Sequence, residues 1–177
     1  MTHDALGSFH LFTALLAVVS GAFVLRGSKA TRQHRLLGYL YVNAMLSANL
    51  SALAITRLSG GFNLLHGFAL ISLASIAIGL FAVVWRRPKT RWFDLHIHSM
   101  AWSYIGLIAA LISESATRIG VPWLVHNGYP PRSGFWLLLG LATGAVVMAG
   151  AIALYRRLPA LERYRPRTSE PAPRTSP

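Results

Sequence analysis

The sequence of 177 residues contains no cysteine and only five acidic residues. Without thiols there can be no disulfide, no iron–sulfur cluster, no thiolate-bound haem and no cysteine-bound zinc. Any bound metal or haem would need histidine, methionine or carboxylate ligands. Charged residues make up 12% of the chain and hydrophobic residues 54%. Because a soluble domain carries about twice that charged fraction, the composition predicts an integral membrane protein.

The usual enzyme motifs are missing as well. The sequence has no Ser-His-Asp or Cys-His arrangement, no phosphate-binding glycine loop, no HExxH zinc motif and no paired carboxylates. Hydrolase chemistry is therefore not expected. The first residues carry no basic segment, and no cleavage site follows the first apolar run. We expect no removable signal peptide and a first span that stays in the membrane.

Five long apolar stretches are present instead, each near the roughly 20 residues that a helix needs to cross a bilayer core. The expected spans cover residues 7–25, 34–55, 64–85, 91–118 and 134–155. They predict an all-α membrane bundle with four core helices and a fifth packed outside, in one domain over residues 1–157. Residues 120–133 contain three prolines and predict an ordered cap on the bilayer surface. Residues 158–177 predict a basic, Pro-rich, disordered tail.

The basic residues are distributed asymmetrically. Fourteen of the seventeen lie in two loops and the tail on one side of the predicted bundle, and the other side has only Arg57, Arg118 and Arg132. The positive-inside rule then predicts a multi-pass membrane protein with an outside N-terminus and a cytoplasmic C-terminus. The net charge of +12 is explained by topology and anionic lipid, so nucleic acid is not an expected partner.

Four histidines occur near the ends of four successive spans. His10 and His66 are expected near the outer surface, and His34 and His96 near the inner surface. In an up-down four-helix bundle alternate helices are diagonal. Each side of the membrane would therefore hold two histidines that face each other across the core.

Histidines on facing helices can ligate a b-type haem from both sides. The inner pair, His34 and His96, is the preferred ligand set, because Arg32, Arg35 and Arg91 lie nearby for the propionates. The same two histidines could instead bind a transition metal such as copper. The same groups could also bind a quinone headgroup. The alternative without a ligand is that the histidines cap helices at the membrane surface.

Further polar residues share these helix faces. Tyr41 lies seven residues after His34, and Tyr104 eight residues after His96, so both tyrosines are candidates for cofactor binding. Glu114 and Arg118 are spaced i,i+4 and predict a structural ion pair that faces the bundle.

Gly140 and Gly144 form a GxxxG pair in the last span, which has no ionisable residue. Small residues at this spacing allow helices to approach closely. The pair predicts either a scaffold helix or a homodimer contact.

Two short motifs resemble a known family. The first is the pattern HR-x-x-G-x-x-Y within RQHRLLGYLY, residues 32–41. The second comprises His96, Met100, Ser103, Tyr104 and Arg118. Both are similar to signatures of the uncharacterised bacterial membrane proteins grouped as domain of unknown function 2306, over roughly residues 7–118. The resemblance implies a multi-pass protein of the bacterial inner (cytoplasmic) membrane and leaves the activity open.

Three functions are compatible with these patterns. The first is electron transfer through a histidine-bound haem b. The second is a non-catalytic role in assembling or stabilising a respiratory complex, with a respiratory-chain protein as partner. The third is binding of a quinone or small ligand, or transport, for which a water-filled path to Asn49 or Glu114 is expected.

Overall fold

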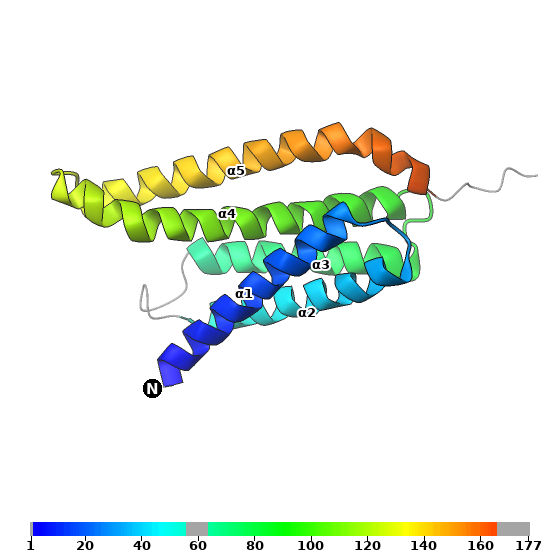
Figure 1. Ribbon diagram of the computed structural model, residues 1–177, viewed down its shortest axis with the longest axis horizontal. Helices are drawn as coiled ribbons and strands as arrows, with labels where there is room; N and C mark the ends of the chain where they lie inside the picture. The colour runs from blue at the N-terminus through cyan, green and yellow to red at the C-terminus, as the bar shows by residue number, and fades with distance from the viewer. Residues whose placement is uncertain (1, 56–63, 166–177) are drawn as a thin grey trace, which may run out of the picture.

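A computed structural model describes residues 2–55 and 64–165, which form helices joined by short connections (Figure 1). The helices are α1 (Thr2–Arg26), α2 (Arg32–Ala54), α3 (Leu64–Trp85), α4 (Trp92–His126) and α5 (Pro131–Leu161), followed by the 3-10 turn η1 (Glu162–Tyr164). All five α-helices are long and apolar enough to cross a membrane. The predicted all-α fold with five membrane-spanning helices is confirmed.

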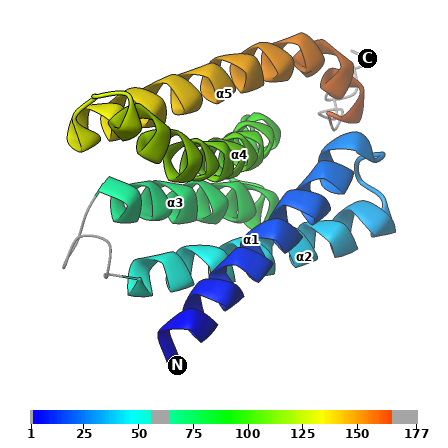
Figure 2. The same ribbon diagram turned by 60° about the vertical axis from the view of Figure 1, so that its left-hand side comes forward.

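The first four helices form a ring. Each packs against the next in sequence, and α1 contacts α4 to close the ring, so α1 is diagonal to α3 and α2 is diagonal to α4. Helix α1 crosses the bundle obliquely, and α5 lies along the outer side of α4 (Figures 1 and 2). This is the predicted arrangement of four core helices and one outer helix.

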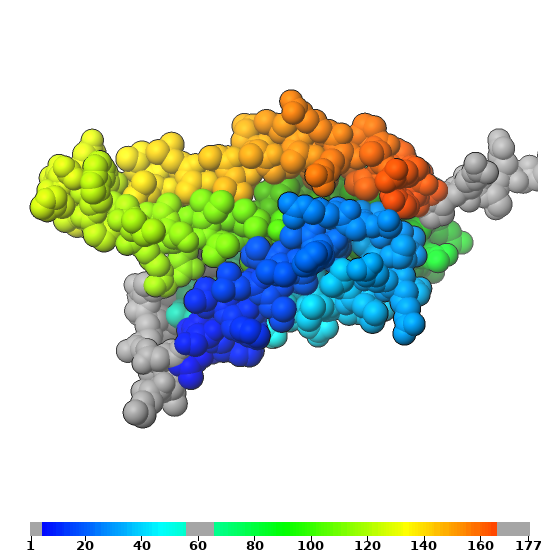
Figure 3. All heavy atoms as spheres, in the orientation of Figure 1, coloured from blue at the N-terminus to red at the C-terminus, as the bar shows by residue number. Residues whose placement is uncertain are grey.

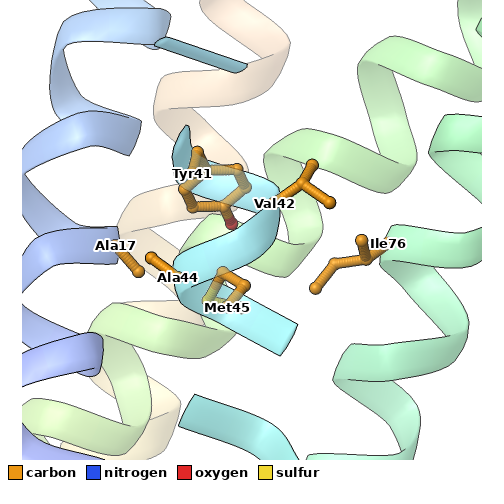
Figure 4. Packing of buried hydrophobic residues seen from close by; sticks show 6 residues of the cluster. All are labelled: Ala17, Tyr41, Val42, Ala44, Met45 and Ile76. Atoms are coloured by element: carbon orange, nitrogen blue, oxygen red, sulfur yellow. The ribbon is translucent and has the colours of Figure 1, made fainter. Parts of the chain in front are cut away.

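The core is built mainly from small side chains. Figure 4 shows Tyr41 and Met45 of α2 between Ala17 of α1 and Ile76 of α3. Large apolar side chains are instead exposed, up to 77% for Ile119. In a bilayer, helices gain little by hiding large apolar groups from lipid, and small residues let them pack closely. The distribution of side chains is therefore that of a membrane protein.

The connection between α4 and α5 differs from the predicted cap. Helix α4 continues through Pro122 to His126, and a short turn then leads to Pro131 at the start of α5. Gly128 has a φ of +86° and its N–H donates to the Val125 carbonyl, while the Tyr129 N–H donates to the Leu124 carbonyl. These bonds form a Schellman cap, so the glycine and not the earlier proline ends the helix.

The α4–α5 hairpin extends past the other helices at one end of the molecule (Figure 3). At the opposite end, helical structure reaches Tyr164, so residues 158–164 are not part of a tail. Arg165 donates to the carboxylates of Asp94 and Glu162, which fastens this segment to the start of α4. Residues 166–177 of the predicted tail lie outside the described residues.

Candidate functional site

The basic segments 26–35, 86–91 and 156–165 lie at one end of the bundle, here called the basic end (Figure 1). His34 and His96 lie close to the starts of α2 and α4, which are at this end. Helix α2 begins there, and Thr31 is its N-cap. The Thr31 hydroxyl accepts a hydrogen bond from the His34 N–H at 3.0 Å. Because this cap satisfies one of the free N–H groups of the first turn, it fixes His34 as the third residue of α2.

The tautomer of His96 follows from its hydrogen bond. Its Nδ1 lies 2.9 Å from the carbonyl oxygen of Gly79 on α3. A carbonyl only accepts, so Nδ1 carries the proton and Nε2 keeps its lone pair. Close helix packing makes this bond possible, because a Cβ at Gly79 would lie 2.8 Å from the Met100 sulfur. Histidines that ligate metals usually donate their second nitrogen in this way.

His34 reaches the same region from the diagonal helix. It is half-buried, its Nδ1 is buried, and no described residue is a hydrogen-bond partner for that atom. His34 and His96 thus lie at the same end of the bundle, on the diagonal helices α2 and α4. A ligand shared by the two histidines stays a prediction.

A pocket of about 310 Å³ lies beside His34, between the end of α1 and the start of α2. Its volume is at the lower end of the range for small-molecule sites. The arginine in its wall is Arg26, whereas the predicted propionate partners Arg32 and Arg35 do not line it. The lining residues are Phe23, Val24, Arg26, Gly27, Ser28, Thr31, Gln33, His34 and Leu37.

Lys29 closes the end of α1 next to this pocket. Its ammonium group donates to the carbonyls of Val24 at 2.6 Å and Leu25 at 2.9 Å. Burial, followed by the nearby charge of Arg157, lowers the pKa of Lys29. The lysine is thus held by the carbonyl end of α1, where a cation is favourable.

The two candidate tyrosines are part of the packed core, deeper in the bundle than the histidines. The Tyr41 hydroxyl is 2.8 Å from the Ser103 hydroxyl, and the Tyr104 hydroxyl donates to the Val18 carbonyl at 3.2 Å. Their ring centroids are 6.3 Å apart. Gly21 of α1 lies against both rings. These side chains seal the bundle about two helical turns below the histidines.

The outer histidines have a different environment. The Nδ1 of His10 is 2.9 Å from the Ala48 carbonyl and 3.1 Å from the Ser51 hydroxyl, so His10 contacts the adjacent helix α2. His66 is 3% exposed near the start of α3. A ligand shared by His10 and His66 stays a prediction.

The predicted ion pair of Glu114 and Arg118 is formed but does not face the bundle. Arg118 donates to Glu114 Oε1 through Nη2 at 2.6 Å, and the two side chains are 52% and 73% exposed for Glu114 and Arg118. Helices α3 and α4 are antiparallel, and Gly79 of α3 packs against Ser99 and Met100 of α4. Counting outward from this contact by the same number of residues along both helices places the first residue of α3 level with Glu114. Arg118 therefore lies beyond the first residue of α3, and within the described part of the chain this helix has no residue at its level.

The remaining polar and glycine positions have simple structural explanations. Asn49 donates to the Met45 carbonyl and to the Ser72 hydroxyl of α3 at 3.0 Å, a bond between helices of the kind expected for a buried amide. A Cβ built at Gly140 or Gly144 would have no neighbour within 4 Å among the described residues, so none of these covers that face. A homodimer through these glycines stays a prediction.

Comparison with known sequences identifies the family. The family described as predicted membrane protein DUF2306 matches residues 7–153, which cover the four-helix ring and most of α5. The chain belongs to this family. The family match extends further along the chain than the two motifs, whose last residue is Arg118. Comparisons with curated proteins and with solved structures gave no match. The chain is thus a multi-pass membrane protein of the DUF2306 family, and its activity has to be argued from the basic end.

Proposed function

We propose that this DUF2306 protein transfers electrons within the bacterial cytoplasmic membrane and holds one b-type haem between His34 and His96. The observation that carries the proposal is the bond from His96 Nδ1 to the Gly79 carbonyl, since it leaves Nε2 as a ready ligand. The proposal places the basic end in the cytoplasm, in agreement with the positive-inside rule.

The residues present fit such a group. His34 contributes a second imidazole with a buried, unbonded nitrogen, and Arg26 is available in the adjoining pocket for a propionate. In the part of the chain that is described, no group of three or more His, Asp or Glu could hold a metal ion. Two histidines without further protein ligands would suit a haem better than a protein-only copper site. Bound haem would supply one-electron chemistry.

The chain's own residues then have separate tasks. The Thr31 cap orients the start of α2, and the Gly79 carbonyl fixes the ring plane and tautomer of His96. Tyr41 and Tyr104 keep water from the deeper side of the pair, because their hydroxyls are already bonded within the protein. A hydrogen bond from the second ring nitrogen, such as that from His96 to Gly79, raises the basicity of the ligating nitrogen and holds the ring in place.

Spectroscopy tests the proposal. The protein is purified from cells supplied with a haem precursor, and oxidised and reduced spectra are recorded. A six-coordinate b-type spectrum should appear and should be lost in His34→Ala and His96→Ala. His98→Ala is the matched control, because His98 donates to the Asp94 carbonyl of its own helix and lies beside Tyr155 of α5. A colourless wild-type protein that elutes as a folded species would refute the haem.

The pocket beside His34 favours a quinone headgroup as the second candidate. Arg26, Gln33 and His34 offer hydrogen-bond donors for quinone oxygens in a space of about 310 Å³. If the protein is colourless, titration with a short-chain quinone should show saturable binding that His34→Ala weakens. A role in assembling a respiratory complex predicts instead that the protein still co-purifies with that complex after both histidines are replaced by alanine.

A further inference from the structure

A second pocket lies at the basic end, on the connection between α3 and α4. It has a volume of about 390 Å³ and is lined by Trp85, Arg86, Arg87, Lys89 and Trp92. Trp85 is the last residue of α3 and Trp92 the first of α4. The pocket is therefore framed by one tryptophan at the end of each apolar span, and three of the four cationic residues between them in the sequence line it.

The positive charge of this pocket is not compensated by any ion pair within the described residues. The carboxylates described at the basic end are Asp94 and Glu162, and Arg165 binds both. Among the described residues, none forms an ion pair with Arg86, Arg87 or Lys89. The pocket therefore offers three positive charges to a ligand from outside the chain.

The position of the pocket decides between possible anions. Tryptophans at the ends of membrane helices lie at the level of the lipid headgroups. Trp85 is 61% exposed, and the ring of Phe81, one turn deeper, lies 4.9 Å from it and is also exposed. An apolar track thus leads from the cationic pocket toward the membrane interior, as an acyl chain attached to the headgroup would require.

The Arg86 side chain is already held in place. Its guanidinium carbon lies 5.7 Å from the centre of the Trp92 ring, a cation–π contact. Arg86 also has a φ of +49°, which directs the chain sharply out of α3. The bend puts the Arg86 cation over the first residue of α4.

We propose that this pocket binds the phosphate headgroup of an anionic phospholipid, with an acyl chain along Trp85 and Phe81. Arg86, Arg87 and Lys89 contact the phosphodiester, and the two tryptophans border the headgroup. Basic pockets at this depth on the cytoplasmic side recognise anionic lipids through such charges. The lipid would fasten the α3–α4 connection to one leaflet.

Lipid retention measured by native mass spectrometry tests the site. The purified protein is mixed with phosphatidylglycerol, with phosphatidylcholine of the same chain length, or with inorganic phosphate. Phosphatidylglycerol should bind with defined stoichiometry, and its affinity should fall by about tenfold or more in Arg87→Gln/Lys89→Gln. The matched control, Arg32→Gln/Arg35→Gln, removes the same charge at the basic end from outside this pocket and should retain the lipid.

Three outcomes would overturn the proposal. Equal loss in both double variants would show attraction to net charge instead of a site. Equal retention of phosphatidylcholine would show that the anionic headgroup is not selected. Displacement of the lipid by inorganic phosphate at equal concentration would show an anion site without lipid recognition. Elution profiles of both variants establish that each is folded before the comparison is made.

Discussion

Gly21 determines how closely α1 approaches the two tyrosines of the core. A Cβ at this position would lie 2.5 Å from the Tyr104 ring and 3.0 Å from the Tyr41 ring. Both rings are held by their hydroxyl bonds to Ser103 and Val18, so neither can withdraw without losing a bond. A single hydrogen atom as side chain is therefore what lets the ring of helices close at this level.

Replacing Gly21 with alanine should destabilise the protein by about 1–3 kcal/mol, the usual cost of overpacking a core. Gly38→Ala is the control, because a Cβ at this helical glycine has no neighbour within 4 Å. There alanine should be neutral or stabilising, since it restricts the unfolded chain. Thermal unfolding in detergent compares the two, and an unchanged midpoint for Gly21→Ala would mean that the tyrosines move freely.

Glu114→Gln should change stability by less than about 1 kcal/mol, the typical range of an exposed ion pair. Both side chains of the Glu114–Arg118 pair are more than half exposed, so neither leaves a buried charge when its partner is removed. The thermal midpoints of Glu114→Gln, Arg118→Gln and the double variant should therefore be similar. A larger loss in the single variants than in the double one would place the pair inside an interface.

At the scale of elements, the α4–α5 hairpin depends on the conformation of one residue. The φ of Gly128 is +86°, and the cap at Gly128 turns the chain so that Pro131 begins α5. Gly120 and Gly134 then allow the two helices to touch, with Leu138 and Leu124 lying over them.

Gly128→Ala should cost about 1–2 kcal/mol, because an L-residue with a side chain is strained at positive φ. Gly106→Ala in the same hairpin is the control, since its helical position is open. Limited proteolysis and thermal unfolding should both show a weaker hairpin for Gly128→Ala alone. Equal behaviour of the two variants would mean that the turn has another way to form.

The elements could be predicted from sequence to the extent that hydrophobicity defines them. The starts and ends of α2 and α3 agree closely with expectation, because polar and basic residues bracket each apolar run. Pro122, which the sequence assigned to the predicted surface cap, lies inside α4. Proline is tolerated in a membrane helix whose neighbours satisfy the freed carbonyl. Asn127-Gly128 followed by Pro130-Pro131 was the better indication of the true end.

The site was predictable only in part. His34 and His96 lie near the starts of the second and fourth predicted spans, and this was enough to place both at one end of the bundle. The bond from His96 to the Gly79 carbonyl depends on how far α3 is shifted along α4, which no single-helix pattern contains. Arg26 and Arg165 were missed for the same reason: their partners are set by the packing of segments far apart in the sequence.

At the scale of the whole molecule, both basic connections and the end of α5 lie on one side (Figure 1). The α2–α3 and α4–α5 connections join the opposite ends of the helices. The fold therefore keeps the predicted charge asymmetry between the two membrane surfaces.

Reporter fusions test the orientation. Fusions after Gly27, Gly60, Pro88, Gly128 and Pro166 should report inside, outside, inside, outside and inside. The physical reason is the cost of moving clustered arginines and lysines across the membrane. An outside reporter after Pro166 would reverse the proposed topology and with it the cytoplasmic position of the basic end.

The peripheral position of α5 has a consequence for biosynthesis. Among the α-helices, α5 packs only on α4 within the described chain, whereas α1 closes the ring by contacting α4. The N-terminal part of a chain emerges first from the ribosome. All four helices of the ring are therefore synthesised before α5. The insertion machinery then needs to hold these four helices together until α1 and α4 meet. Helix α5 then docks on a surface that has already been built.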